Sequence, residues 1–469
     1  MKVICTVLCQ LLFAGLCLLL SVGSARAQGT APFKPEMLSG FIQKYCSKCH
    51  GAKEPEADLR LDNVSPHLSR DKTEGTWRRV LDALRDGDMP PEGEPKPDAG
   101  ELKAVMDHLA IAISRSTTLL KPLPQYKTEG IEIPHATADE PQLDRFNHEA
   151  AVKYLDDGAV AWVRSYKCIT CHSSGTYMAE RPGLTKMLGP PPAEVHKNFT
   201  DAVYIESPDK GDFWFVWRTL GLAEWDKHVS GNLSEHTDQA LKEMFSRQQD
   251  NGAWNIAERR IQIPHVISEF ELAVQAARAI AAAPGWLENL EEENLRQGVE
   301  RLRKYFRGYQ PRNDYELTLR LRVDTLLPGV VSPEQRRQSI ALLRRRQQED
   351  GGWSTRCMSD VQDWSVVADP RLADAWQSRP DADHPGSDAY MTAFAIVLLR
   401  EAGVPADDEQ IQEGIAWLKS NQRQSGRWWL QSLTYPGDNR RHFTTYIATA
   451  QVLRAMNLCG ELKPAVASE

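Results

Sequence analysis

Apolar residues recur at helical spacing in three segments of the first 120 residues. The first segment, PEMLSGFIQKY at 35–45, opens with a proline, which favours a helix start. The others are GTWRRVLDALRDG at 75–87 and DAGELKAVMDHLAIAISRS at 98–116. The pattern predicts a small helical domain over 34–118. Residues 119–147 contain four prolines and little periodicity, which is typical of a linker between domains.

Beyond the linker, amphipathic segments alternate with more apolar segments of similar length. Three amphipathic segments end in the pattern Q-x-x-x-G-x-W, which occupies 248–254, 347–353 and 422–428. A degenerate copy without the tryptophan begins at GVERLRKYFRGYQ, residues 298–310. Repeats of this size indicate an array of helical hairpins. The sequence therefore predicts an all-α protein whose second domain, 148–460, contains about five hairpin repeats.

The N-terminus has the composition of a secretory signal peptide over residues 1–27. Lys2 precedes an almost wholly apolar run at 3–20, and Ala25 and Ala27 place small residues before a cleavage point. The alternative is an uncleaved membrane anchor, because the run is close to spanning length. The expected location is periplasmic or otherwise exported, with membrane attachment only if the signal is retained.

The charge balance argues against nucleic acid as a partner. The formal net charge of −8 becomes −10 without the signal, which carries Lys2 and Arg26 and no acidic residue. Arginines are dense between 296 and 346. We interpret them as solvated helix faces, with a docking patch for an acidic partner as the alternative.

Two copies of C-x-x-C-H carry the most specific chemistry in the chain. The first comprises Cys46, Cys49 and His50, and the second comprises Cys168, Cys171 and His172. This motif attaches c-type haem. Two thiols one helical turn apart can add to the two vinyl groups on one edge of the macrocycle, and the adjacent histidine can ligate the iron. We therefore predict two covalent haems, with His50 and His172 as iron ligands.

The pair of cysteines has two other known uses, a redox dithiol and half of a zinc site. A redox C-x-x-C does not require the following histidine, and zinc needs a second ligand pair, whereas the motifs lie more than 100 residues apart. Outside the signal and the motifs only Cys357 and Cys459 remain. An exported protein would permit them to form a disulfide, although sequence cannot show that they meet.

Residues 38–115 resemble the planctomycete-type cytochrome c domain. The resemblance is carried by the first motif, by ADLRLDNVS at 57–65, and by LRDGDMPPEGEPKPDAGELKAV at 84–105. It implies that Met89, before two prolines, is the second axial ligand, and His/Met ligation raises the reduction potential. The alternative is that Met89 is an ordinary loop residue and His67 binds the iron.

The Q-x-x-x-G-x-W repeats resemble the squalene–hopene cyclase and prenyltransferase superfamily, whose members fold as an α/α toroid with inner and outer helical rings. In that fold the glutamine and tryptophan brace helix ends. The resemblance covers about 148–460 and indicates fold rather than activity.

The second C-x-x-C-H resembles the first repeat of this array. Gly175 and Tyr177 can stand for the repeat glycine and tryptophan, with Cys171 at the glutamine position. The following inner helix is then expected in GDFWFVWRTLGLAEW, residues 211–225. The sixth iron ligand of this haem stays open in the sequence. Met187, His196, His228 and an unoccupied position are the alternatives.

The preferred function is electron transfer through covalent haem, with a redox protein as partner. The toroid is expected to bind a partner or a hydrophobic or polymeric substrate. One alternative is a terpenoid-type cyclase with a fused cytochrome, for which Asp381 and Asp383 partly match an acidic D-x-D-D motif and His384 departs from it. Another is a non-catalytic scaffold that carries haem. Neither alternative identifies a catalytic residue.

Overall fold

The structure is a computed structural model, and it describes most of the chain. The described residues are 35–53, 55–56, 59–62, 73–85, 87–91, 93–119, 126–205, 211–256, 268–364, 376, 381–431, 433 and 443–464. The predicted signal peptide and His67 lie outside them. The chain divides into two compact units, Met1–Pro122 and Leu123–Glu469. Within the described part, no helix has the length and apolar character needed to cross a bilayer.

The first unit contains the three helices that the apolar spacing predicts. They are α2 (Pro35–Tyr45), α3 (Thr73–Arg85) and α4 (Ala99–Leu119). Their apolar faces form one small core around Phe41, Trp77 and Leu109. Trp77 and Leu109 are almost fully buried because α3 packs against α4.

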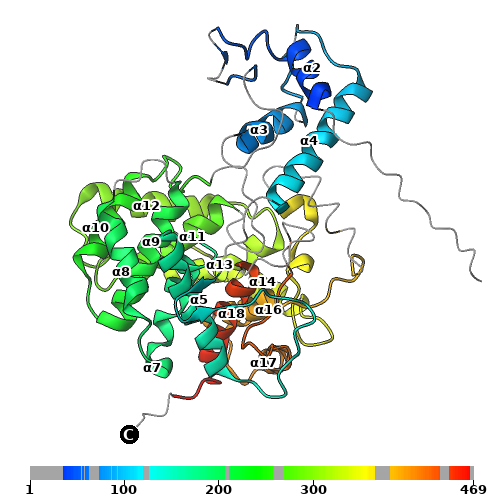
Figure 1. Ribbon diagram of the computed structural model, residues 1–469. Helices are drawn as coiled ribbons and strands as arrows, with labels where there is room; N and C mark the ends of the chain where they lie inside the picture. The colour runs from blue at the N-terminus through cyan, green and yellow to red at the C-terminus, as the bar shows by residue number, and fades with distance from the viewer. Residues whose placement is uncertain are drawn as a thin grey trace, which may run out of the picture. The chain divides into compact units, whose positions relative to one another are not determined.

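The second unit is a closed ring of inner helices surrounded by outer helices (Figure 1). The inner helices are α6 (Ser174–Glu180), α9 (Asp212–Trp225), α11 (Glu269–Ala282), α13 (Asp314–Leu326), α16 (Ala389–Glu401) and α18 (Phe443–Leu458). Each packs against the next, and α18 packs against α6 to close the ring. Nearly every residue of α9 and α16 is buried, as expected for helices covered on all sides.

Each inner helix is preceded in the chain by an outer helix. The outer helices are α5 (His148–Tyr166), α8 (Ala193–Asp201), α10 (Glu235–Ser246), α12 (Glu293–Gly308), α14 (Pro333–Arg345) and α17 (Glu409–Ser420). In α12 and α17 the buried residues recur every three or four positions, so only one face is covered.

Short elements complete the second unit. They are β1 (Lys127–Thr128), β2 (Ile131–Glu132), η2 (Pro182–Leu184), α7 (Thr185–Leu188), η3 (Ala202–Tyr204), η4 (Asp226–Ser230), η5 (Thr355–Met358) and η6 (Val361–Trp364). The strands β1 and β2 pair antiparallel.

The all-α class and the α/α toroid are confirmed, and the structure defines the pairing more finely than the sequence does. Six outer–inner pairs are present among the described residues, where the sequence indicates about five. The additional pair arises because α5 pairs with the short helix α6, and α8 then pairs with α9. With only seven residues, α6 is too short for its apolar period to be read from sequence.

The three Q-x-x-x-G-x-W turns share one geometry, as the resemblance implies. The indole Nε1 of Trp254, Trp353 or Trp428 donates to a carbonyl ten residues earlier, at 2.7 Å in each turn. Each glutamine amide donates to the carbonyl of its own glycine and to a carbonyl of the next outer helix or its N-cap. The repeat therefore fastens each hairpin to its neighbour.

The last repeat turn, 422–428, is hydrogen-bonded to the start of α5, the first outer helix, and this contact closes the outer ring. Gln422 exchanges two hydrogen bonds of 2.7 Å with the backbone of Asn147, the N-cap of α5. Residues 126–147, for which the sequence predicts a linker, pack on this seam. Arg427, which is 2% exposed, donates to the carbonyls of Pro134 and His135 and pairs with Glu140.

Gly426→Ala is expected to destabilise the second unit strongly. Gly426 has φ +90°, where an alanine costs about 1–2 kcal/mol of backbone strain. Its new Cβ would also lie 2.3 Å from the Ala150 carbonyl carbon, so the turn at 422–428 would have to move away from α5. Chemical denaturation of the purified protein measures the loss.

Gly329→Ala is the matched control for this substitution. Gly329 has φ +81°, but no heavy atom lies within 4 Å of the place that an alanine Cβ would occupy, so only the backbone strain applies. Equal losses in the two variants would contradict the role of Gly426 in the seam.

Candidate haem-attachment sites and a buried charge chain

The first C-x-x-C-H motif continues the turn at the end of α2. The Cys46 amide donates to Ile42 O at 2.9 Å, and the His50 amide donates to Cys46 O at 2.9 Å. Cys46 and Cys49 are therefore one helical turn apart, with His50 beginning the next. This is the arrangement that attachment of both thiols to one macrocycle edge requires.

His50 is oriented by a backbone carbonyl. Its side chain is 7% exposed, and its Nδ1 lies 3.0 Å from Leu59 O. A carbonyl oxygen only accepts, so Nδ1 carries the hydrogen, and the lone pair of Nε2 is the one suited to a metal. Burial raises the pKa of Cys46 to about 11, so the unattached thiol is protonated at neutral pH. The donor set and the hydrogen bond that orients the imidazole fit a haem iron.

Met89 lies in the loop between α3 and α4. Its amide donates to Ala83 O at 3.2 Å, and its side chain is 39% exposed. The Lys96 ammonium donates to the carbonyl of Pro90, the residue after Met89. The loop is thus anchored on both sides of an exposed thioether, and the ligand role of Met89 stays a prediction.

The second motif occupies the turn between α5 and α6. Lys167 ends α5 in a left-handed conformation, with φ 47°. The Cys168 carbonyl then accepts from two side chains, Trp162 Nε1 at 2.8 Å and Ser174 Oγ at 3.0 Å. In the first motif the corresponding carbonyl accepts from the histidine amide. The two motifs share residue types but differ in backbone support.

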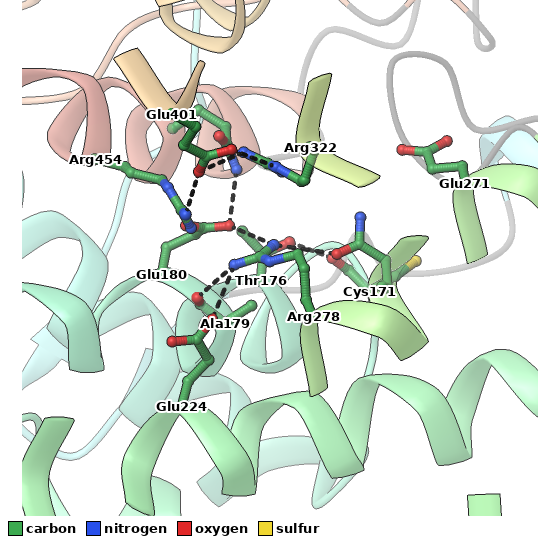
Figure 2. Close-up of polar contacts among 12 residues, drawn as sticks. Cys171, Thr176, Ala179, Glu180, Glu224, Glu271, Arg278, Arg322, Glu401 and Arg454 are labelled. Atoms are coloured by element: carbon green, nitrogen blue, oxygen red, sulfur yellow. Dashed lines mark hydrogen bonds and ion pairs between the residues drawn. The ribbon is translucent and has the colours of Figure 1, made fainter. Parts of the chain in front are cut away.

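Two aromatic rings contact His172. The His172 and Phe443 ring centroids are 3.7 Å apart, and the Trp162 ring meets His172 edge-on at 5.5 Å. Cys171 is 6% exposed, and its carbonyl accepts from the Thr176 hydroxyl (Figure 2). Two thiols and an imidazole in a partly apolar setting have the donor chemistry that covalent haem needs.

The alignment of this motif with the repeat turn is wrong in one respect. Gly175 and Tyr177 lie inside α6 and do not form a glycine turn. Tyr177 donates to Asp156 Oδ1 at 2.6 Å, whereas the repeat tryptophans donate to backbone carbonyls. The first inner helix is therefore α6, and residues 211–225 supply the second, α9.

The three alternatives for a sixth ligand lie at the opposite end of the inner ring from His172. His172 precedes the N-terminus of α6, whereas Met187 follows its C-terminus in α7. His228 lies beyond the C-terminus of α9, with Nε2 3.3 Å from Glu224. His196 stacks on Trp225 at 4.1 Å, and burial lowers its pKa to about 4. The structure does not bring these residues together with His172.

Each inner helix places at least one charged side chain, mostly or fully buried, within its last five residues. In helix order these are Glu180, Glu224, Arg278, Arg322, Glu401 and Arg454. Figure 2 shows them close together, and their places near the helix C-termini put them at one end of the ring. We call this set the charge chain. Its members also show that all six inner helices point the same way.

The charge chain alternates in sign. Arg278 donates to Glu180 at 3.0 Å and to Glu224 at 3.3 Å. Arg454 donates to Glu180 and Glu401, both at 2.5 Å, and Arg322 donates to Glu401 at 3.0 Å. The carboxylates lie at helix C-termini, where the helix dipole disfavours negative charge, so the arginines must stabilise them. Burial alone would raise the pKa of Glu180, but Arg278, Arg454 and Arg322 outweigh it and lower the pKa to about 2.

The acidic residues before α16 that partly match a D-x-D-D motif are not buried. Asp381 has a side chain 46% exposed and pairs with Arg356, and Asp383 and His384 are exposed. Cys357 and Cys459 are free thiols. Cys357 lies in η5, before the N-terminus of α16, and Cys459 follows the C-terminus of α18, so they occupy opposite ends of the inner ring.

The two units match two different families. Residues 46–93 match planctomycete cytochrome C, and residues 330–462 match the squalene-hopene cyclase C-terminal domain. Both resemblances seen in the sequence are thereby confirmed for these segments. The chain thus joins a cytochrome c-like domain to a cyclase-like toroid. No curated protein matches it.

Solved structures similar to the chain include terpene cyclases. The type II terpene cyclase MstE from Scytonema is 16% identical, with a TM-score of 0.38 over 66% of this chain and 96% of that one. A protein from Actinoplanes is 14% identical, with a TM-score of 0.38 over 67% of this chain and 100% of that one.

Sequence reasoning missed the aromatic residues at the second motif and the whole charge chain. A signal for the charge chain was present, because charged residues occur in otherwise apolar segments, such as the single arginine of AARAIAA and the Arg-Glu pair that ends AIVLLRE. A lone charge in a helix buried on all sides needs a partner from another helix.

Proposed function

We propose that this protein is an exported di-haem c-type cytochrome that transfers electrons to or from a redox partner protein. The observation that carries the proposal is the first motif, whose thiols are one turn apart and whose histidine is held by the Leu59 carbonyl. A bound haem c supplies one-electron redox chemistry. Its location outside the cytoplasm rests on the predicted signal peptide.

The residues of the first unit have separate roles in this proposal. Cys46 and Cys49 would attach the group, and His50 would bind its iron through Nε2. The Leu59 carbonyl holds the imidazole in one orientation and one tautomer. A fixed ligand favours fast electron transfer, because the side chain does not have to rearrange when the iron changes oxidation state. Met89 would supply a thioether ligand to the iron, which would raise the potential.

The second motif is proposed to attach a second haem to the toroid. Cys168 and Cys171 lie in the turn between α5 and α6, and His172 contacts both Phe443 and Trp162. The toroid then serves as a redox relay and as the surface or chamber for a partner or substrate.

Two observations favour this function over a terpenoid cyclase. The acidic residues that partly match a D-x-D-D motif are solvent-exposed, so they cannot protonate an alkene away from water. The inner ring also contains the charge chain, whereas a polyisoprenoid needs an apolar lining.

A mediated redox titration of the full chain tests the proposal. The protein is expressed with its N-terminal segment in a host that matures c-type cytochromes, and its visible spectrum is recorded against potential. We expect two reversible one-electron transitions. A protein with no reducible covalent haem would contradict the proposed function.

Met89→Leu is expected to leave the first haem attached and to lower its midpoint potential, because the thioether ligand is lost. Met106→Leu is the control, since Met106 is a partly buried methionine of the same unit that packs on its core. Equal potentials in the two variants would exclude Met89 as the ligand.

A further inference from the structure

Trp162 contacts two residues of the second motif, Cys168 and His172. Its Nε1 donates to the Cys168 carbonyl at 2.8 Å, and its ring lies 5.5 Å from His172 at an interplanar angle of 86°. It also lies 6.2 Å from Phe443, the ring that packs closely on His172. Trp162 is 6% exposed, so its position is fixed by packing.

Tyr166 connects this buried tryptophan to the surface. It lies one helical turn after Trp162 on α5, and the two ring centroids are 4.5 Å apart. The Tyr166 side chain is 44% exposed, which makes it one of the few large exposed apolar or aromatic side chains among the described residues. An exposed aromatic ring is thus joined through one buried ring to the predicted iron ligand.

We propose that Tyr166 and Trp162 form the route by which an electron reaches the second haem from the protein surface, and that Trp162 also positions Cys168. The inference rests on the proposed attachment of haem at Cys168 and Cys171. Electron tunnelling weakens steeply with each gap between orbitals, so two rings in contact carry an electron better than aliphatic side chains. Neither ring is changed overall when the electron passes.

The two parts of the proposal have different structural requirements. The route needs aromatic rings at both positions, whatever their polar atoms. Positioning needs the Trp162 N–H, because the Cys168 carbonyl accepts from it. Trp162→Phe therefore retains the route and removes the positioning bond, whereas Trp162→Leu removes both. Tyr166→Leu removes only the surface end of the route, and Tyr166→Phe retains it.

Flash photolysis with a ruthenium(II) bipyridyl label measures the route directly. Ser165→Cys places the label beside Tyr166, in a background where Cys357 and Cys459 are serine. One electron leaves the excited ruthenium(II), giving ruthenium(III), and the ferric iron held by His172 becomes ferrous. We expect Tyr166→Leu and Trp162→Leu to slow this transfer severalfold and both phenylalanine variants to retain it.

A second label position separates a route effect from a change at the haem itself. Lys153→Cys carries the label on α5 at a side chain 76% exposed, 13 residues before Tyr166 and therefore about 20 Å along the helix. Transfer from this label is expected to be the same in all Tyr166 variants. The midpoint potential and visible spectrum of the second haem are expected to change in Trp162→Phe and not in Tyr166→Phe.

The possible failures are distinguishable. A wild-type chain with only one covalent haem would overturn the proposed function at the second motif. Two haems with unchanged transfer from the Ser165→Cys label in both leucine variants would overturn the route alone. If Trp162→Leu fails to bind the second haem, the exposed Tyr166 variants still decide the question.

Discussion

Glu180→Ala is expected to destabilise the toroid by about 3–5 kcal/mol, the usual cost of removing one partner from a buried ion pair. Glu180 has a side chain only 3% exposed and accepts from both Arg278 and Arg454. Its loss leaves these two guanidinium groups without their shared carboxylate in a buried site. Denaturant unfolding followed by tryptophan fluorescence measures the effect, because most of the tryptophans belong to the toroid.

Glu334→Ala is the matched control. Glu334 also pairs with an arginine, Arg337, but both side chains are at least 60% exposed. An exposed pair is screened by water, so this variant is expected to unfold like the wild type. Equal stability of Glu180→Ala and Glu334→Ala would show that the charge chain does not hold the ring together.

Glu180 also makes the stability of the toroid depend on pH. The pKa of Glu180 falls from an ordinary 4.5 to about 2, because the three arginines outweigh the effect of burial. Its contribution is therefore complete above about pH 4.5 and is lost as the pH falls toward 2. Glu180→Gln should flatten this part of the stability profile.

Replacing Cys168 and Cys171 together with alanine is expected to remove one covalent haem and leave the other. The two thiols provide both attachment bonds in the toroid, whereas the first unit has its own pair, Cys46 and Cys49. The remaining absorption spectrum should be that of the first haem alone. Absorption and mass measurements on the purified variant check both statements.

Replacing Cys357 and Cys459 with serine is the control for this double substitution. Both are free thiols outside the motifs. This control should retain every haem of the wild type. If the Cys168/Cys171 variant also retains them, the second motif has a different function.

The parts of the fold that depend on contacts between residues close in the chain could be predicted from sequence. The helices of the first unit follow from apolar spacing. The Q-x-x-x-G-x-W turns follow from a tryptophan, a glycine and a glutamine whose bonds are mostly local, such as Trp353 to Leu343.

The remaining features depend on contacts between residues far apart in the chain. Arg278 and Glu180 are 98 residues apart, and Arg454 and Glu180 are 274 apart. No pattern of neighbouring residues predicts which of several buried charged side chains will form an ion pair. For the same reason the sequence did not show that Met187, His196 and His228 lie at the opposite end of the ring from His172.

The misplacement of Gly175 and Tyr177 has a similar cause. A glycine and an aromatic residue at repeat spacing also occur inside a helix, and only the backbone distinguishes the two cases. Gly252, Gly351 and Gly426 have φ between 86° and 95°, whereas Gly175 is a helical residue of α6.

The number of covalent haems per chain tests the central claim most directly. The protein is matured with its N-terminal segment, denatured, and assayed by pyridine haemochrome against protein mass, with intact mass spectrometry as a second measure. The proposed function predicts two haems per chain. One haem per chain would contradict it and leave a cytochrome c-like domain joined to a toroid in which Cys168, Cys171 and His172 have another role.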